Sequence, residues 1–401
     1  MALSQKTFDN FLHFYWSSFL LLYFFGFSHF IFLFYAVALI VYLLHTQKKS
    51  QYFLLFLVIL LFSLLFVENS KQLLVGFRNV LTHFLFMYLL LYANTSLKII
   101  PIFNRIIIIF SSAIILVSVF IMMDTNVGLK LGLYYLLPQS IIENDTVGSI
   151  LTTVLYTSQT ISNFKIYRPL LFFMNENFTL YSFIIMSTLG IYYKSFLSNY
   201  GRRLLFISIP LLLLLTIVST GRGVYIAFSI SVFFLLYRNK KLFIGALLLV
   251  LILALINYSL IIDFLKNIVD LFNLRTGGDL GDRSNVYLTT YEYFLKKPIF
   301  GLGAQLEVEG FVSYPLGSHS YWLGVLFMYG LFGFSIFLFL WTRIVKRTYK
   351  LLNRKDRLPF INLVLIVFFI MFFENIEYDI VYLMVVVFVF MFFKYISTVR
   401  I

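Results

Sequence analysis

The stretch from Asn10 to Gln47 decides the fold class of this chain: NFLHFYWSSFLLLYFFGFSHFIFLFYAVALIVYLLHTQ. It contains no Asp, Glu, Lys or Arg. It is also too long for one membrane-spanning helix, which needs ~20 apolar residues to cross a hydrocarbon core of ~30 Å. We expect a break between Gly26 and His29, and therefore a hairpin of two spans. Because the apolar run continues directly into the second span, no cleavable signal peptide is expected.

The composition extends this interpretation to all 401 residues. Hydrophobic residues make up 61% of the chain, aromatic residues 20% and charged residues only 12%, whereas a soluble domain carries about 25% charged residues. A soluble fold has too little interior to hide so much apolar surface. This excludes a soluble protein, a disordered chain and a nucleic-acid binder. The chain has no cysteine, which also excludes disulfides, a thiolate nucleophile and Cys-based metal sites.

Reading on in the same way predicts an all-α, polytopic membrane protein with about twelve membrane-spanning helices. Two connecting segments are too long to be turns, and long ordered loops are usually functional. The chain then divides into spans one to five (1–123), a first external loop (124–168), spans six to nine (169–262), a large external loop expected to be catalytic (263–317) and spans ten to twelve (318–401). The predicted spans are 11–27, 29–45, 52–68, 72–93, 102–123, 170–194, 203–219, 221–237, 241–262, 318–345, 358–375 and 378–396.

The basic residues orient these spans, because Lys and Arg are enriched in short cytoplasmic loops. With both termini inside, the cytoplasmic segments hold most of the 31 Lys and Arg residues, and the stretch from Arg343 to Arg357 is the densest. Of the 17 acidic residues, Asp9 and Asp356 alone fall on that side. The net charge of +14 is therefore explained by topology, without a nucleic acid or an acidic substrate.

The most specific motif starts where the large external loop ends. His319-Ser320 is followed by the nine residues Tyr321 to Tyr329 and then by Gly330-Leu331-Phe332-Gly333. Taken alone, it predicts a histidine at the mouth of a helix, above a packing face of small residues. Three further stretches accompany it: Asp282-Arg283-Ser284-Asn285 upstream of Pro298-Ile299-Phe300-Gly301-Leu302-Gly303, Ser219-Thr220-Gly221-Arg222-Gly223, and Phe173-Met174-Asn175-Glu176-Asn177-Phe178 preceded by Arg168.

Together these stretches, over roughly residues 165–340, resemble the O-antigen ligase and polymerase superfamily. The third stretch departs from the family pattern, with Met174 in place of a Gly and Glu176 in place of a Pro. The resemblance implies metal-independent glycosyl transfer, without a cofactor, on the external (periplasmic) face of a bacterial cell (inner) membrane. It also implies a glycan donor and acceptor linked to polyprenyl diphosphate, such as undecaprenyl diphosphate. A chain-length regulator and a flippase are candidate partners beside membrane lipids, and nucleic acid is not one.

The candidate residues suit this chemistry. A departing diphosphate needs counter-charge, which arginine supplies through bidentate hydrogen bonds. We assign this role to Arg222 and Arg283, with Arg275 as a second-rank candidate. The simpler alternatives are an interfacial anchor for Arg222 and a solvated loop residue for Arg275. The remaining candidates for substrate binding are Arg168, Asn175, Glu176 and Asn177.

A sugar hydroxyl is a poor nucleophile, and a histidine with a pKa of ~6.5 is the usual general base for it. His319 fits this role, and Glu307 and Glu309 are alternatives, although a solvated acidic face explains them more simply. The other histidines (His13, His29, His45 and His83) lie in or beside early spans and are expected to be packed. The chain has no Asp-x-Asp motif, so a metal held by paired carboxylates is not expected.

The departures at Met174 and Glu176 favour a Wzy-type polysaccharide polymerase for capsule or O-antigen, since polymerases each meet a different repeat unit. An O-antigen ligase of the same superfamily is the alternative within this class. From other classes, a lipid-oligosaccharide flippase or transporter would show repeat symmetry and polar groups at the membrane midplane. A scaffold for a glycan-assembling machine would not need an external cluster of His and Arg.

Overall fold

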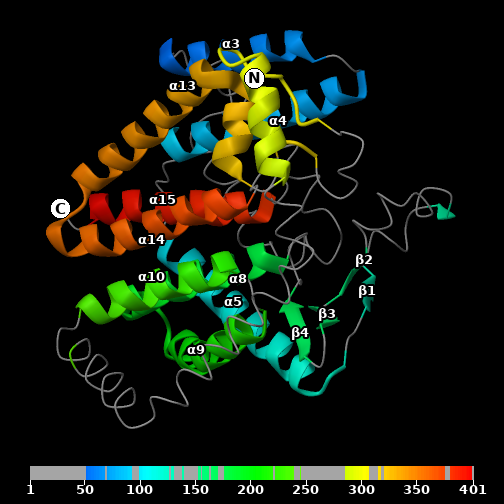
Figure 1. Cartoon of the computed structure of the whole chain (residues 1–401). Coiled ribbons are helices and arrows are strands. Elements are labelled where there is room, and N and C mark those ends of the chain that lie inside the picture. Colours follow the sequence, from blue (N-terminus) through cyan, green and yellow to red (C-terminus); the bar gives the residue numbers. More distant parts are fainter. Residues whose placement is uncertain are drawn as a thin grey trace.

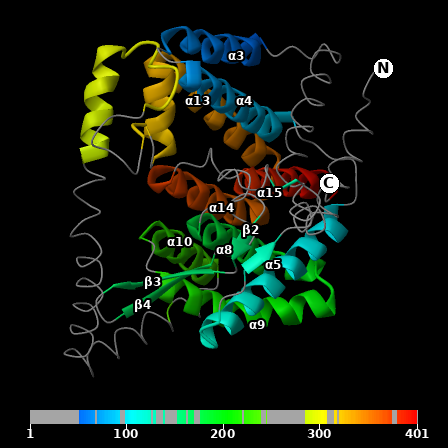
Figure 2. The same cartoon turned by 90° about the vertical axis from the view of Figure 1, so that its right-hand side faces the viewer.

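Apolar helices packed on one another build most of the protein that the structure, a computed structural model, describes (Figures 1 and 2). The described residues are 51–67, 70–92, 99–125, 128–130, 138–139, 152–154, 156–161, 164–169, 176–219, 222–238, 244, 285–306, 315–317, 320–374 and 380–399. The helices are α3 (Gln51–Ser63) with the 3₁₀ turn η1 (Leu64–Phe66), α4 (Ser70–Tyr92), α5 (Ile99–Met122), α8 (Glu176–Tyr192) with η3 (Lys194–Phe196), α9 (Asn199–Ser219), α10 (Arg222–Arg238), α13 (Tyr321–Leu351), α14 (Arg354–Phe373) and α15 (Ile380–Val399), together with a helix over 285–296.

Within the described residues, four helices are long and apolar enough to cross a membrane. They are Ile99–Met122, Asn199–Ile217, Tyr321–Leu351 and Arg354–Phe373, with mean hydropathies of 2.6, 1.6, 2.2 and 2.0. Shorter apolar helices cover Leu55–Phe66, Val75–Leu91, Gly223–Arg238 and Val385–Thr398. The prediction of an all-α polytopic membrane protein is confirmed.

The predicted spans coincide with helices wherever the chain is described, from the span at 52–68 (α3 and η1) to the one at 378–396 (α15). The predicted spans at 11–27, 29–45 and, apart from Ile244, 241–262 lie outside the described residues. The total of twelve therefore stays a prediction.

The segment predicted as the first external loop contains two pairs of antiparallel strands that the sequence analysis did not predict. Strand β1 (Gly128–Lys130) pairs with β2 (Thr152–Val154), and β3 (Tyr156–Ile161) pairs with β4 (Phe164–Pro169), both antiparallel. The Thr, Tyr and Ile residues of these segments favour extended backbone. Strand β4 packs against α8 and α9, so the second strand pair rests on the helical bundle.

The two ends of the bundle differ in the way the charge pattern predicts. Figure 1 shows β1 to β4 at the end of the bundle where α8 begins and α14 finishes. The connection between α13 and α14, within the basic stretch from Arg343 to Arg357, lies at the opposite end. Long apolar helices thus separate the segment predicted to be external from the one predicted to be cytoplasmic.

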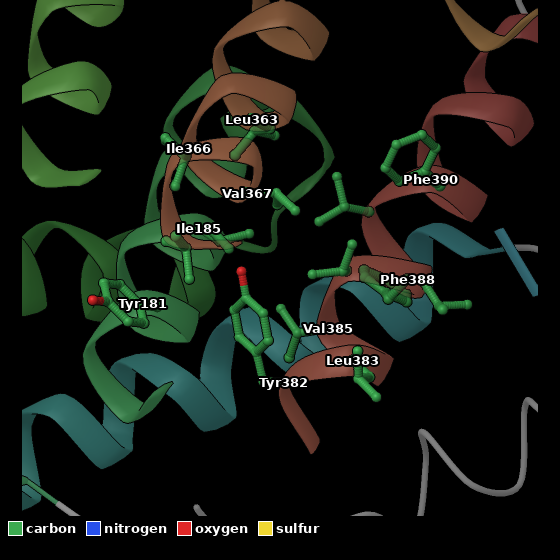
Figure 3. Close-up of a cluster of buried hydrophobic side chains, with 14 of the residues drawn as sticks. Tyr181, Ile185, Leu363, Ile366, Val367, Tyr382, Leu383, Val385, Phe388 and Phe390 are labelled. Carbon is green, nitrogen blue, oxygen red and sulfur yellow. The ribbon is translucent and has the colours of Figure 1, made fainter. Parts of the chain in front are cut away.

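The core of the bundle lies where α8, α14 and α15 meet (Figure 3). Ile185, Ile366 and Val385 are each 0% exposed there. Toward the end of the bundle where α8 begins, this core is closed by aromatic rings, with Phe178 and Tyr382 centred 5.1 Å apart and Tyr181 and Tyr382 6.5 Å apart. This aromatic layer borders a set of polar side chains, because the hydroxyl of Tyr181 lies 3.5 Å from Oε1 of Glu374.

Near the opposite end of the bundle, the half-buried Lys394 and the buried Asp356 form hydrogen bonds with backbone or hydroxyl groups. Lys394 of α15 donates from Nζ to the carbonyls of Leu90 (2.6 Å) and Leu91 (3.1 Å), at the end of α4, where helical carbonyls have no partner within the helix. Asp356, in the first turn of α14, accepts a hydrogen bond of 2.9 Å from the hydroxyl of Tyr193. These contacts join the helices without leaving a bare charge in an apolar interior.

The predicted orientation can be tested by cysteine labelling, which is clean because the chain has no native cysteine. A cysteine replacing Ser158 in β3 should react with a membrane-impermeant maleimide in intact cells that have a permeabilised outer membrane. A cysteine replacing Asn353, between α13 and α14, should react only after the cell membrane is breached. The opposite pattern would overturn the assignment of these strands to the external face.

Candidate functional site

Helix α13 is broken in the middle of the histidine motif, at Gly330. This residue has φ 65° and ψ −174°, while the residues on both sides of it are helical. Side-chain-bearing residues essentially never adopt this backbone conformation, which is the reason a glycine stands there. Figure 1 shows the resulting sharp bend between the first turns of α13 and its long second part. The Gly330 of the motif therefore makes a helix break, where the sequence alone indicated a packing face of small residues.

The second glycine motif, residues 298–303, fills this break. The backbone N–H groups of Leu302 and Gly303 donate to the carbonyls of Phe327 (3.0 Å) and Met328 (2.9 Å). In the other direction, the N–H groups of Leu331 and Phe332 donate to the carbonyls of Pro298 (2.8 Å) and Ile299 (3.2 Å). The backbone groups that lose their helical partners at the break are thus paired with the external segment.

Glycine is required on both sides of this contact because the two backbones approach so closely. A Cβ added to Gly330 would lie 2.2 Å from the carbonyl oxygen of Ile299, and one added to Gly301 would lie 2.4 Å from that of Met328. Gly301 also has a φ of +74°. The stretches 298–303 and 320–333, which are separate in the sequence, therefore form one structural unit.

Helix α4 holds the first part of α13 in place. The ring of His83 lies 5.0 Å from that of Tyr321 and 5.3 Å from that of Tyr329. Its Nδ1 is 3.0 Å from the Tyr329 hydroxyl and 2.7 Å from the carbonyl of Asn79. His83 is completely buried, so the sequence-based expectation of a packed histidine agrees with its surroundings.

The chain on both sides of His319 is anchored. Gly317, with φ +83°, donates its N–H to the hydroxyl of Thr290 at 3.1 Å, in the helix over 285–296. Ser320 caps α13, because its hydroxyl accepts a hydrogen bond of 3.3 Å from the N–H of Leu323. The helix that starts two residues after Arg283 is therefore tied directly to the chain that leads into His319.

The ends of several helices meet at a buried carboxylate, Glu374, directly after α14. This residue is only 8% exposed. The side-chain amide of Asn177 donates to its Oε1 at 2.6 Å, and the hydroxyl of Tyr181 lies 3.5 Å from the same oxygen. The backbone carbonyl of Glu374 accepts a hydrogen bond of 3.1 Å from the N–H of Tyr321, the first residue of α13. One residue thus links α8, α14 and the start of the histidine-motif helix.

The start of α10 lies against the same group. A Cβ added to Gly223 would lie 2.1 Å from the hydroxyl of Tyr181 and 3.3 Å from the Cβ of Phe373. The close fit explains why a glycine follows Arg222. It also brings the N-terminus of α10, the positive end of its dipole, next to the end of α14. The backbone of Arg222 is thereby positioned beside the hydrogen-bonded set of Asn177, Tyr181 and Glu374, which we call the Glu374 cluster.

The predicted site residues fall into two groups. Arg222 begins α10, Glu176 begins α8 with Asn177 beside it, and Arg168 lies in β4 opposite Thr157. Asn177 is the one of these whose side-chain contact the structure describes. His319, Arg283, Arg275 and Asn175, with the alternatives Glu307 and Glu309, lie outside the described residues. No three His, Asp or Glu side chains in the described ranges gather as metal ligands would.

Glu374 was missed by the sequence analysis, although a signal for it was available. It follows the apolar run of span eleven directly, in Phe372-Phe373-Glu374-Asn375. An ionisable residue at the end of a membrane span is costly and is a functional candidate by default. Glu374 lies in a short connection between two spans, outside both long loops and outside the family motifs, so neither of those signals marked it.

The fold and the Glu374 cluster define a multi-pass helical membrane protein with polar groups gathered at one end of its bundle. Residues 204–338 match the family described as O-Antigen ligase. This confirms the resemblance to the O-antigen ligase and polymerase superfamily, whose membrane enzymes use lipid-linked oligosaccharides. The matched part runs from α9 into α13 and includes Arg222, Arg275, Arg283 and His319. No curated protein and no solved structure matched the chain.

Replacing Gly330 by Ala should destabilise the protein strongly, because it forces a side chain into a glycine-only conformation and against the carbonyl of Ile299. We expect a loss of at least ~1–3 kcal/mol from the backbone alone, seen as a lower Tm in detergent. Gly190→Ala in α8 is the matched control, since its Cβ would lie 3.0 Å from the tip of a flexible leucine, Leu205. Equal melting temperatures for the wild type and Gly330→Ala would show that the glycine conformation at the break in α13 does not contribute to the stability of the protein.

Replacing Glu374 by Ala should lower stability by ~1–3 kcal/mol, because Asn177 loses its buried acceptor. Glu374→Gln should cost less, since an amide oxygen can still accept from Asn177. Thermal unfolding in detergent measures both, with the exposed Glu292 replaced by Ala as a control expected to be nearly neutral. If Glu374→Ala behaves like that control, the cluster does not join the helices.

Proposed function

We propose that this protein is a polysaccharide polymerase. It joins oligosaccharide repeat units carried on polyprenyl diphosphate into a capsule or O-antigen polymer at the external face of the cell membrane. The observation that carries the proposal is the meeting of α8, α10, α13 and α14 at the Glu374 cluster. Two of these helix ends adjoin the residues that the family motifs single out, Arg222 and His319.

In the proposed reaction, an acceptor sugar hydroxyl attacks the anomeric carbon of the donor glycan. The bond from that carbon to the diphosphate oxygen breaks, and the electron pair leaves with the diphosphate. The hydroxyl proton passes to His319 as general base. Arg222 and Arg283 neutralise the diphosphate through bidentate hydrogen bonds, with Arg275 as a further contact. No step needs a metal.

Glu374 has a positioning role in this scheme. Its backbone carbonyl holds the start of α13, two residues after His319, and its carboxylate holds Asn177. Its negative charge next to the N-terminus of α10 favours a cationic side chain nearby, and Arg222 is the first residue of that helix. We assign Arg168, Asn175 and Glu176, which lie before or at the start of α8, to the binding of the sugar. Glu307 and Glu309 remain the alternative bases.

A ligase would use the same donor and residues but transfer the finished glycan to a lipid A core. A flippase would move the lipid-linked unit across the membrane without a covalent step. For a polymerase, a chain-length regulator and a flippase that delivers the repeat units are the expected protein partners. The fate of the glycan in cells that lack the protein separates these three functions.

Deletion of the gene should leave single repeat units on the cell surface, because transport continues while polymerisation stops. Complementation of the deletion with the wild-type gene should restore long chains.

In vesicles with purified lipid-linked repeat unit, His319→Ala at equal abundance should lower the rate of polymerisation by ~10²–10⁴-fold. Arg222→Lys should also be impaired, since it keeps charge but loses the bidentate fork. Arg203→Lys, exposed at the predicted cytoplasmic end of α9, is the matched control.

Complete polymer left on its lipid carrier in the deletion strain would instead identify a ligase. Repeat units trapped on the cytoplasmic side would identify a flippase. A normal rate per molecule for His319→Ala would remove this residue from the mechanism.

A further inference from the structure

Four phenylalanine rings form a cluster that remains exposed beside the break in α13. The ring of Phe300 lies 5.1 Å from that of Phe62, 5.9 Å from that of Phe66 and 6.4 Å from that of Phe332. Phe62, Phe300 and Phe332 are 43%, 38% and 46% exposed. The rings come from α3, η1, the segment 298–303 and α13. We call this set the Phe300 cluster.

The Phe300 cluster continues into an apolar strip along α3. Leu55, Val58 and Phe62 of α3 and Leu65 of η1 are all exposed, at a spacing of three or four residues that keeps them side by side along the helix axis. The strip runs from η1 toward the start of α3, along the direction of the span, and an extended hydrocarbon chain in one membrane leaflet can lie along it.

One lysine contacts the Phe300 cluster, and a second lysine precedes it in the chain. Lys297 lies with its Nζ 5.6 Å from the centre of the Phe66 ring and 3.4 Å from the Phe66 carbonyl oxygen. The exposed Lys296 precedes it, with its Nζ 3.7 Å from the centre of the Tyr293 ring. A cationic end followed by an apolar strip is complementary to a lipid with an anionic head group and a long chain.

The Phe300 cluster is also directly connected to the candidate site. Phe300 lies between Ile299 and Gly301, in the segment whose backbone fills the break in α13. A chain lying on Phe300 therefore contacts the segment that holds the first part of α13, which begins two residues after His319. An ordinary lipid-facing surface of the bundle, such as the exposed end of α5 at Met122, has no such connection.

We propose that the Phe300 cluster and the apolar strip of α3 bind the isoprenoid chain of the lipid-linked substrate, with Lys296 and Lys297 on the side of its diphosphate. The proposal rests on the substrate class of the proposed function. It adds a surface outside the motif residues that recognises the carrier lipid rather than the sugar. A diphosphate carries more negative charge than the phosphate of a bilayer phospholipid, which favours the carrier over bulk lipid beside two lysines.

Photo-crosslinking tests this without relying on activity. p-Benzoylphenylalanine at position 300 of the full chain, in vesicles of phosphatidylethanolamine and phosphatidylglycerol, should capture radiolabelled undecaprenyl diphosphate. The same residue at position 122 is the matched control, because Met122 is 61% exposed at the end of another predicted span on the same side. We expect about tenfold more product at position 300, which corresponds to a preference of about 1.4 kcal/mol. Unlabelled undecaprenyl diphosphate should compete, whereas added phosphatidylglycerol should not.

Equal labelling at positions 300 and 122 would mean contact with bulk lipid only and would overturn the proposal. So would a product that joins position 300 to another part of the same chain, since the protein itself would then cover the rings. Position 332 gives an independent probe if the substitution at 300 lowers abundance. If position 300 captures the lipid selectively but the protein makes no polymer, the proposed function is refuted and the lipid site stands. If the protein makes polymer but positions 300 and 122 are labelled equally, the lipid site is refuted and the proposed function stands.

Discussion

The break in α13 at Gly330 is the constraint on which the site depends. In a membrane, a backbone group without a hydrogen-bond partner costs several kcal/mol, so a helix can break only where another part of the protein supplies partners. Residues 298–303 supply four of them. This contact joins the segment predicted to be the large external loop to the bundle, ties the helix over 285–296 to α13, and fixes where the histidine-motif helix starts.

Around this contact, polar groups gather at one end of an otherwise apolar bundle. Glu374 is buried and hydrogen-bonded, and it joins α8, α14 and α13 at the end where the charge pattern predicts the external face. The start of α10 closes the same group through Gly223. The N-terminus of α10, with its helix dipole and Arg222, places positive charge at this end of the bundle, as the proposed departure of a diphosphate requires.

The proposed polymerase would handle two different parts of its substrate, a hydrophilic glycan and a very apolar carrier. The arrangement found here offers separate places for them. The Glu374 cluster and strands β1 to β4 lie toward the end of the bundle that is predicted to be external, whereas the Phe300 cluster and the exposed strip of α3 continue along the span. The segment 298–303 carries Phe300 and is hydrogen-bonded to α13, and the first residue of α13 is held by the carbonyl of Glu374, so α13 connects the two regions.

The sequence by itself determined the class of fold and indicated the superfamily, which the match over residues 204–338 supports, and it predicts the orientation. Long uncharged runs permit few structures other than membrane helices, and the spans predicted at 102–123 and 358–375 coincide with α5 and α14 because local hydropathy alone decides them. The spacing from His319 to Gly333 was enough for the superfamily. Only the tertiary structure decided what Gly330 does, that residues 298–303 fill its break, and that Glu374 joins the helix ends. These depend on contacts between segments far apart in the chain, such as Asn177 with Glu374, and hydropathy or motif spacing contains no information about which distant backbone or side chain will be the partner.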